Sequence, residues 1–309
     1  MDSLFYIVIL CIEAVRLNIY ERISYMAIFF NQATLSYNDN VTNSNIVTGQ
    51  LLEVLTADKT AVIPVYEQGG GVTYVISIRN SGASSFTALT VTDDLGAYSQ
   101  GGQTLIPLDY VEGSVRYFVN GVLQPAPATD TGAALVISGI NIPAGGNAII
   151  VYETEANRFA PPDIEGTVTN TAVITGGGLA TPVTVSETVA AQASPDLSIS
   201  KAISPDTVVE NDTLTYTFVI QNYGNAPAEV DDNAVVTDTF DPILSPINVT
   251  FNGEVWEEGV NYTYNSTTGE FATVAGQITV PAATFTRNEE TGAWTVTPGV
   301  SVLRVSGTV

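Results

Sequence analysis

The sequence predicts an all-β protein that folds as more than one β-sandwich. Short runs rich in Val, Ile, Thr, Tyr and Phe, often alternating with polar residues, are separated by clusters of Gly, Asn, Asp, Ser and Thr. This pattern is typical of half-buried strands joined by turns. The runs recur at roughly 8–12 residues, as strands do in sandwiches. No segment after residue 30 combines a helical period with caps, and 309 residues allow two domains that each have a core.

Eight runs are the clearest strand candidates: Val72–Ile78, Leu89–Thr92, Val115–Val119, Ala148–Tyr152, Val168–Ile174, Leu214–Ile220, Val249–Phe251 and Val300–Val305. Asn-Gly pairs at 120–121 and 252–253 predict hairpin turns of type I′, in which both central residues have positive φ. The two pairs occupy corresponding places in the two halves of the chain, which indicates a repeat.

Lysine marks this internal repeat, because it occurs only twice, as Lys59 and Lys201. After each lysine come a proline-containing stretch, an alternating strand, an Asn-x-Gly turn and a Val-Thr-Asp step that ends at Asp93 or Asp238. Recurrence of the whole string predicts a tandem array of one module. We expect an N-terminal strand or hairpin and two sandwich modules, over residues 26–50, 51–193 and 194–309.

The composition excludes several classes of function. The chain has 9 Lys and Arg against 32 Asp and Glu, so no basic surface for nucleic acid is expected. Only 13% of residues are charged and 45% are hydrophobic, which indicates a folded chain whose acidity keeps it soluble outside the cell or in a dense assembly. Histidine is absent and Cys11 is the single cysteine, which excludes Ser/His/Asp and Cys/His catalysis and histidine metal sites. We expect no enzyme activity, no metal and no cofactor.

Residues 1–25 form an atypical leader. The apolar run Leu4–Ile12 has the length of a signal-peptide core, but it follows Asp2 rather than a basic residue and precedes no small-residue cleavage site. At nine residues it is too short to span a bilayer. We expect the mature chain to begin at Met26. A degenerate signal sequence and an amphipathic helix packed on the body are the alternatives.

The string from lysine through Asn-x-Gly to Val-Thr-Asp resembles the bacterial "conserved repeat domain" family, the domain of unknown function numbered eleven. The segments INIPAGGNAIIVYE (140–153) and GTVTNTAVITG (166–176) are similar to the closing strands of that family, and MAIFFNQATLSYN (26–38) is similar to the start of a subgroup from anaerobic bacteria. The resemblance implies tandem immunoglobulin-like sandwiches with Greek-key-type connections. It also implies exposure on a bacterial surface and a structural or adhesive role without enzymatic activity.

The closing strands of the second module are expected from elsewhere in the chain. In the first module the IIVYE strand is followed by the closing strands, whereas the second module reaches its equivalent strand at 301–309. Residues 31–36 parallel residues 170–175, and the distance from each segment to the next module's lysine is similar. The N-terminal segment therefore has the pattern of a displaced closing strand.

Strand addition by this segment would place Asn31, Ala33 and Leu35 in the open core of the second module. Between chains the contact is head-to-tail and propagates into a ring or filament. The alternatives are that the segment extends the sheet of the first module, or that it folds back within its own chain.

The two lysines are candidates for isopeptide bonds, in which a lysine amine joins an asparagine carboxamide beside a buried acid. Burial favours the neutral amine that this reaction needs. The first candidate set is Lys59, Asn170 and Asp93, and the second is Lys201, Asn31 and Asp238. The alternative is that each lysine is exposed and weakly paired with surface acids.

Other motifs have plainer interpretations. The acidic pairs at 93–94 and 231–232 can supply oxygen ligands for Ca²⁺, but they lack EF-hand spacing and are typical of solvated turns. Three Asn-x-Ser/Thr sequons, at 248, 261 and 265, are expected products of Asn- and Thr-rich turns.

Together these features predict a structural protein of a bacterial surface or appendage, extracellular or on the cell or spore surface, that self-associates and has no membrane span. The secretion route cannot be read from the sequence. The rival interpretation is an adhesin that recognises a host or cell-surface protein or glycan. An exposed aromatic cluster would favour it, and Trp256, Tyr262 and Tyr264 are the candidates. We expect Trp256 and Trp294, however, to pack in the core or in a hairpin.

Overall fold

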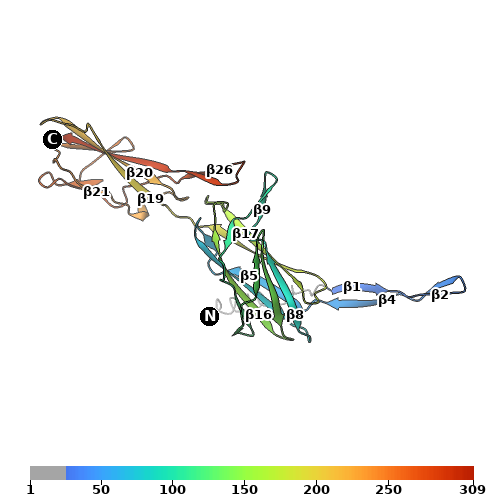
Figure 1. Cartoon of the computed structure of the whole chain (residues 1–309). Coiled ribbons are helices and arrows are strands. Elements are labelled where there is room, and N and C mark those ends of the chain that lie inside the picture. The colour runs from blue at the N-terminus through green and yellow to red at the C-terminus, as the bar shows by residue number, and fades with distance from the viewer. Residues whose placement is uncertain (1–25) are drawn as a thin grey trace, which may run out of the picture.

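The computed structural model describes residues 26–309. The leader, with its Cys11, lies outside the described residues, and the expected start at Met26 is their first residue. Figure 1 shows an elongated molecule with a long N-terminal hairpin at one end, a first sandwich in the middle and a second sandwich with the C-terminus at the other end. We call these parts the N-terminal hairpin (26–52), the first sandwich (β5 to β18) and the second sandwich (β19 to β28).

The first sandwich has two six-stranded sheets. One sheet has the order β13 (Val122–Leu123), β12 (Arg116–Val119), β16 (Asn147–Ala156), β7 (Gly71–Asn80) and β5 (Leu55–Ala61), with β11 (Leu108–Tyr110) also paired to β16. The other has the order β14 (Ala128–Thr131), β15 (Leu135–Ile142), β8 (Phe86–Asp93), β17 (Thr167–Gly176), β18 (Val183–Ala191) and β6 (Val65–Tyr66). A small hairpin of β9 (Tyr98–Gln100) and β10 (Gln103–Leu105) projects from this sandwich.

Alternation along the strands builds the core between these sheets. On β7 every second side chain is buried, and β16 shows the same period. Tyr74 and Tyr152 lie opposite each other in this pair, and their rings stack with centroids 5.7 Å apart. Side chains of period two on paired strands therefore reach the same core, as the sequence pattern predicts.

The second sandwich is smaller and less complete. Its main sheet has the order β19 (Leu197–Ser204), β20 (Thr213–Asn222), β28 (Gly299–Thr308), β22 (Ile247–Phe251) and β23 (Glu254–Trp256). Its facing sheet has only β21 (Thr237–Thr239), β25 (Glu270–Thr273) and β24 (Tyr262–Tyr264). A hairpin of β26 (Thr284–Arg287) and β27 (Trp294–Thr297) and the 3₁₀ turn η1 (Val230–Asp232) complete it.

The sequence predictions of fold are confirmed. Each of the eight strand candidates overlaps an observed strand, and the fold is all-β with two immunoglobulin-like sandwiches. Both Asn-Gly pairs form the expected turns, since Asn120 and Asn252 have φ of 48° and 51° and the following glycines have φ of 79° and 91°. Among the described residues the only helical element is η1.

The repeat is visible in matching buried asparagines. Asn80 ends β7, and its side chain accepts a hydrogen bond from the Gly82 amide at 2.9 Å and donates to the Ser84 carbonyl at 2.8 Å. Asn222 ends β20 and makes the same two contacts, with the Gly224 amide at 2.9 Å and the carbonyl of Ala226 at 2.8 Å. Because a buried carboxamide needs partners, this turn is specified in both copies by the same residue.

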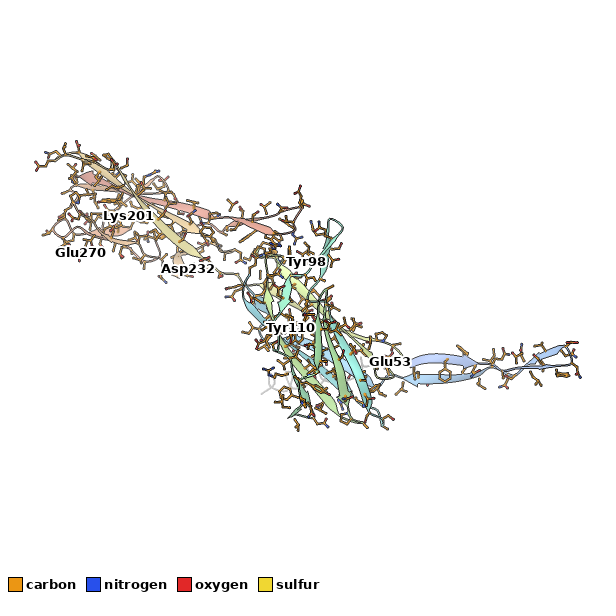
Figure 2. All side chains as sticks on the ribbon, viewed as in Figure 1. Glu53, Tyr98, Tyr110, Lys201, Asp232 and Glu270 are labelled. Atoms are coloured by element: carbon orange, nitrogen blue, oxygen red, sulfur yellow. The ribbon has the colours of Figure 1, made fainter. Side chains whose placement is uncertain are left out.

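The two sandwiches meet through a polar and aromatic contact. Arg287 of β26 donates hydrogen bonds to Gln100 at 3.0 Å and to the hydroxyl of Tyr98 at 3.1 Å. Its guanidinium carbon also lies 5.0 Å from the Tyr98 ring centroid and 4.4 Å from that of Trp294. Figure 2 shows Tyr98 where the second sandwich approaches the first. Trp294, which belongs to the β26–β27 hairpin, therefore packs at this junction between the sandwiches.

The N-terminal hairpin stands apart from both sandwiches. β1 (Met26–Asn31) pairs only with β4 (Val47–Leu52), and β2 (Thr34–Tyr37) pairs only with β3 (Asn40–Asn43). It neither extends the sheet of the first sandwich nor folds back onto the second, which Figure 1 places at the opposite end of the molecule. Over residues 26–309, the structure therefore shows neither an extension of the first sandwich's sheet by this segment nor closure of the second sandwich within one chain.

Candidate isopeptide sites and an open groove

The first candidate site lies inside the first sandwich. Lys59 lies on β5 and Asp93 ends β8, so the two residues come from facing sheets and meet across the core. The Lys59 Nζ and an Asp93 carboxylate oxygen are 2.6 Å apart, and both side chains are fully buried. The interpretation of Lys59 as an exposed residue at a strand start is therefore wrong, because strand alternation turns it inward.

Tyr152 connects this pair to Asn170. The Tyr152 hydroxyl donates to the same Asp93 oxygen at 2.5 Å, and Asn170 Nδ2 donates to the Tyr152 hydroxyl at 3.4 Å. The Asn170 Oδ1 is buried and has no hydrogen-bond partner among the described residues. All three residues of the first candidate set thus share one cluster, together with a tyrosine that sequence reasoning took only as part of a closing strand.

Burial controls the protonation of this cluster. Removal from water lowers the pKa of the Lys59 amine below its ordinary value, and the nearby Asp93 carboxylate opposes this effect. The amine lies 4.9 Å from the centroid of the Tyr74 ring. Burial, with the neighbouring Asp93, raises the pKa of Tyr152 well above its ordinary value, so the phenol stays a neutral donor.

This arrangement is suited to isopeptide chemistry. Transfer of a proton along the short contact from the Lys59 ammonium to Asp93 would leave a neutral amine beside a carboxylic acid. The unpaired Asn170 oxygen marks a carboxamide that a protonated acid can polarise. Formation of the bond between Lys59 and Asn170 stays a prediction.

An Asn170→Ala chain, in which this bond cannot form, should become more stable as the pH rises toward 10.5. The folded pKa of Lys59 is below its ordinary 10.5, so between the two values the unfolded chain binds more protons and the free energy of unfolding increases with pH. Urea unfolding over a pH series measures this slope. The matched control is Asn170→Ala with Lys59→Met, and an identical slope in both proteins would contradict the buried-amine assignment.

The second candidate site is only half assembled. Lys201 on β19 forms an ion pair with Asp238 on β21. These strands lie in facing sheets and correspond to β5 and β8 of the first site. The Lys201 side chain is 41% exposed and that of Asp238 is 17% exposed, whereas both are fully buried at the first site. Asn31 is not beside them; it lies in the N-terminal hairpin opposite Val47. Figure 2 shows Lys201 in the second sandwich, far from that hairpin.

The exposure of Lys201 belongs to a larger uncovered surface. Leu55, which opens β5, is 4% exposed, whereas Leu197, which opens β19, is 39% exposed. Ile199 and Ile203 lie on the same face of β19 as Lys201 and are also exposed. In the first sandwich β17 and β18 complete the facing sheet, and no described strand takes their place in the second.

A groove lies on this uncovered surface. It has a volume of about 150 Å³ and lies between β19 and the segment that leads into β21. Its lining is almost wholly apolar: Leu197, Ser198, Ile199, Ile220, Ala234, Val235, Val236 and Ile278. β21 itself pairs with β25 and with no other described strand, so one of its edges is open. We call this surface the acceptor groove. An open edge beside exposed apolar side chains is a surface that proteins ordinarily cover.

The N-terminal hairpin is also uncovered. Its exposed apolar side chains lie along both arms of the ribbon: Ile28, Phe29, Phe30, Leu35, Tyr37, Val41, Ile46, Val47, Leu51 and Leu52. A two-stranded ribbon has no core of its own, and an isolated hairpin is only marginally stable in water. Such a ribbon is expected to be stabilised by docking against another surface.

The candidate aromatic cluster for ligand binding does not form an exposed patch. Tyr262 is buried and its ring packs against Phe271 in a tilted arrangement. Trp256 packs on Phe251, and the Tyr264 hydroxyl donates to the Leu244 carbonyl at 2.7 Å. Alternation turns these rings toward the core of the second sandwich, which agrees with the interpretation of Trp256 as a packing residue.

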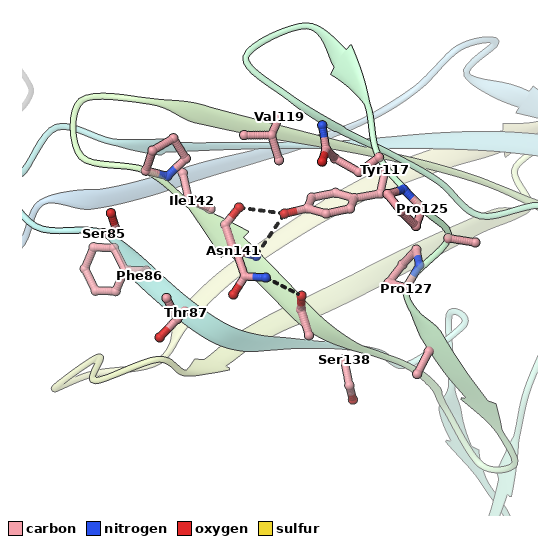
Figure 3. Close-up of a pocket in the computed structure, with 15 residues that line it drawn as sticks. Ser85, Phe86, Thr87, Tyr117, Val119, Pro125, Pro127, Ser138, Asn141 and Ile142 are labelled. Atoms are coloured by element: carbon pink, nitrogen blue, oxygen red, sulfur yellow. Dashed lines mark hydrogen bonds between the residues drawn. The ribbon is translucent and has the colours of Figure 1, made fainter.

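A separate groove of about 660 Å³ lies at one edge of the first sandwich, lined in part by Pro125 and Pro127 (Figure 3). Its central polar groups satisfy each other. The Tyr117 hydroxyl donates to the Asn141 carbonyl at 2.6 Å and accepts from the Asn141 amide at 2.9 Å. Among the described residues, no polar atom that lines this groove is both buried and unpaired.

The acidic pairs have local partners. Asp94 accepts hydrogen bonds from the amides of Gly96 at 2.9 Å and Thr171 at 2.8 Å, while Asp93 is paired with Lys59. Residues 231–232 form the turn η1, and Asp232 caps it by accepting from the amide of Glu229 at 2.7 Å. Over residues 26–309 no group of three or more acidic residues is arranged to hold a metal ion.

Within the described part of the chain, no helix has the length and hydropathy needed to cross a bilayer.

No protein-family model and no curated protein matches the chain. Among solved structures it is similar to the pilus backbone protein RrgB from Streptococcus pneumoniae, with 14% identity and a TM-score of 0.33 over 79% of this chain and 55% of that chain. It is similar to domains D2 and D3 of the major pilin SpaD from Corynebacterium diphtheriae, with 10% identity and a TM-score of 0.34 over 78% and 88% of the two chains. For the collagen-binding domain of a Staphylococcus aureus adhesin the identity is 14% and the TM-score 0.27, over 44% and 95%. The chain therefore spans 55% of the streptococcal pilin structure.

Proposed function

We propose that the protein is a non-enzymatic structural subunit of a bacterial surface or appendage, and that it polymerises when the N-terminal hairpin of one copy enters the acceptor groove of the next. The observation that carries this proposal is the groove itself. The second sandwich exposes an inward face and an open edge at the place where β17 and β18 lie in the first sandwich.

The donor strand has the required alternation. Aligning Asn31 with Asn170 places Phe29, Ala33 and Leu35 at positions that correspond to Val168, Ala172 and Ile174. These three residues of β17 are buried in the first sandwich together with Asn170, while the alternate residues Thr169, Thr171 and Val173 are half-buried or exposed. The donor would therefore bury apolar side chains and leave Thr34 and Ser36 facing outward.

The register of the contact follows from the first sandwich. There Ala172 lies opposite Asp93 and Ile174 lies opposite Val91 in the pairing of β17 with β8. By the same register Ala33 would lie opposite Asp238, which brings Leu35 to the wall of the acceptor groove. Main-chain pairing along the open edge of β21 would supply affinity, and the alternating side chains would supply specificity.

The placement of donor and acceptor favours a chain of subunits. The hairpin and the second sandwich lie at opposite ends of an elongated molecule (Figure 1), and the sandwiches are joined by the Arg287 contact. Donation within one chain would require the molecule to fold back on itself. Donation between copies is heterologous, so each addition leaves one free hairpin and one free groove.

A synthetic peptide of residues 28–42 should shorten the polymers when it is added to the assembling chain. The peptide carries the donor strand but no sandwich, so it fills acceptor grooves without offering a new one. Polymer length measured by electron microscopy should fall as the peptide concentration rises. The control peptide has Leu35 replaced by Asp and should have no effect. A chain that stays monomeric at high concentration without peptide would overturn the proposal.

An adhesin remains the second functional class from the sequence, but the aromatic residues that would favour it pack in or against the core of the second sandwich. The chain's acidity and its lack of histidine agree with a structural role.

A further inference from the structure

We propose that each head-to-tail contact is closed by a covalent bond from Lys201 of one copy to Asn31 of the next, with Asp238 as the proton carrier. This inference rests on the proposed strand donation and deepens it, because it assigns a chemical function to a half-assembled site. The polymer would then resist conditions that dissolve non-covalent fibres.

The half-site has the same construction as the complete one. Lys59 and Lys201 lie at the same register position of equivalent edge strands, since Lys59 is opposite Ile76 on β7 and Lys201 is opposite Phe218 on β20. In both sandwiches the lysine crosses the core to the Val-Thr-Asp aspartate and lies over a tyrosine ring. The Nζ of Lys201 is 4.4 Å from the centroid of Tyr216, and that of Lys59 is 4.9 Å from the centroid of Tyr74.

A partner for this half-site is missing within the described chain. The Asp238 oxygen that faces Lys201 is buried and has no other partner among the described residues. At the complete site, the position beyond the lysine and aspartate is taken by Asn170 on β17. The alignment that makes Leu35 an inward donor residue also places Asn31 at this position, on the inward face.

Docking would change the environment of the pair. Lys201 is 41% exposed in the free chain, and the hairpin would cover the face of β19 on which it lies. Because burial disfavours separated charges, exclusion of water favours the neutral amine and carboxylic acid over the ion pair. The reactive form would then arise only when a donor occupies the groove, which would limit the chemistry to assembled copies.

The reaction balances without an external reagent. Asp238 takes one proton from the Lys201 ammonium and donates it to the carbonyl oxygen of Asn31 as the neutral Nζ attacks Cγ. The new bond is Nζ–Cγ, and the bond that breaks is Cγ–Nδ2. A second proton passes from the attacking nitrogen to Nδ2, which leaves as ammonia, and the oxygen returns its proton to Asp238. That proton then passes to ammonia, so the products are the amide, ammonium and the carboxylate.

The second site lacks the phenol of the first. Tyr152 lies opposite Tyr74, whereas Val305 lies opposite the equivalent Tyr216. Asn31 would therefore contact Asp238 directly, without a bridging hydroxyl. Valine also leaves more room beside the tyrosine ring, where the donated carboxamide would enter.

Denaturing gel electrophoresis of the assembled wild-type chain should show a ladder of multimers that boiling does not dissolve. Lys201→Arg keeps a positive charge but provides no comparable nucleophile, and Asn31→Ala removes the electrophile. Both residues are exposed in the free chain, so both variants should fold, still form fibres by electron microscopy and lose the ladder. Lys59→Ala, at the other site, is the matched control and should keep the ladder.

Mixing the two variants gives a sharper result. The Lys201→Arg chain has an intact donor, and the Asn31→Ala chain has an intact acceptor, so only one kind of contact in the mixture can react. Covalent dimers should appear, and covalent species larger than a dimer should be absent. After digestion of the dimer with trypsin, the peptide that contains Asn31 should be recovered cross-linked to a peptide in which cleavage after Lys201 is blocked.

The outcomes separate the two proposals. Fibres that dissolve completely to monomers on boiling in detergent overturn the covalent bond and leave strand donation standing. A ladder that persists in Lys201→Arg or Asn31→Ala also overturns it. Absence of any fibre or multimer in the wild-type chain overturns strand donation as well.

Discussion

A Leu35→Asp chain is expected to remain monomeric at concentrations at which the wild-type chain polymerises. Leu35 corresponds to the buried Ile174 of β17, so in the docked state it would fill the apolar core of the acceptor groove. An unpaired carboxylate at that position costs several kcal/mol. A cost of about 3 kcal/mol alone weakens each contact more than about 100-fold. Sedimentation velocity and electron microscopy measure the result.

The matched control for this substitution is Ser36→Asp. Ser36 is the next residue on the same strand, and strand alternation turns it to the outer face of the donated hairpin. Leu35 is already exposed in the free hairpin, so neither change should unfold the chain. Ser36→Asp should assemble as the wild type does. Equal assembly of the Leu35→Asp protein would show that this register of strand donation is wrong.

Lys59→Ala is expected to lower the melting temperature by more than about 10 °C. A bond between Lys59 and Asn170 closes a loop of more than one hundred residues, and in a chain-entropy account such a closure stabilises by about 4.7 kcal/mol. Measured in the monomeric Leu35→Asp background, the intact mass should be one ammonia below the sequence mass. In the Lys59→Ala version of that protein the mass should equal the sequence mass.

Asn170→Ala separates the cross-link from the ion pair. Lys59→Ala also leaves Asp93 buried without its partner, which destabilises independently of any bond. Asn170→Ala keeps the pair and removes only the carboxamide, so its melting temperature should fall less than that of Lys59→Ala but remain below that of the parent. A parent mass equal to the sequence mass would refute the intramolecular bond.

Local patterns carried much of the fold. The period of two predicted the strands, and the Asn-Gly pairs predicted two turns, because positive φ at both positions is a local requirement. The repeat around the lysines predicted two equivalent sandwiches. It also placed Lys59 and Asp93 in one candidate site, since equivalent positions in a repeat meet equivalent neighbours.

Tyr152 was not recognised as part of that site. A tyrosine in an alternating strand is typical of a core position, and nothing in its local sequence distinguishes a core ring from a hydroxyl that bridges Asp93 and Asn170. The role of Tyr152 follows only from the tertiary arrangement, because β16 pairs with β7 and faces β17 across the core.

The sequence by itself determined the strands, the turns and the repeated order of lysine, asparagine turn and aspartate, because each depends on residues close together along the chain. Only the tertiary structure decided that Lys59 is buried while Lys201 is half exposed, and that the N-terminal hairpin pairs with neither sandwich. The exposure of each lysine depends on whether strands such as β17 and β18 complete the sheet that faces it. Burial is set by strands distant in sequence, so two lysines at equivalent positions of a repeat can differ in their exposure to water.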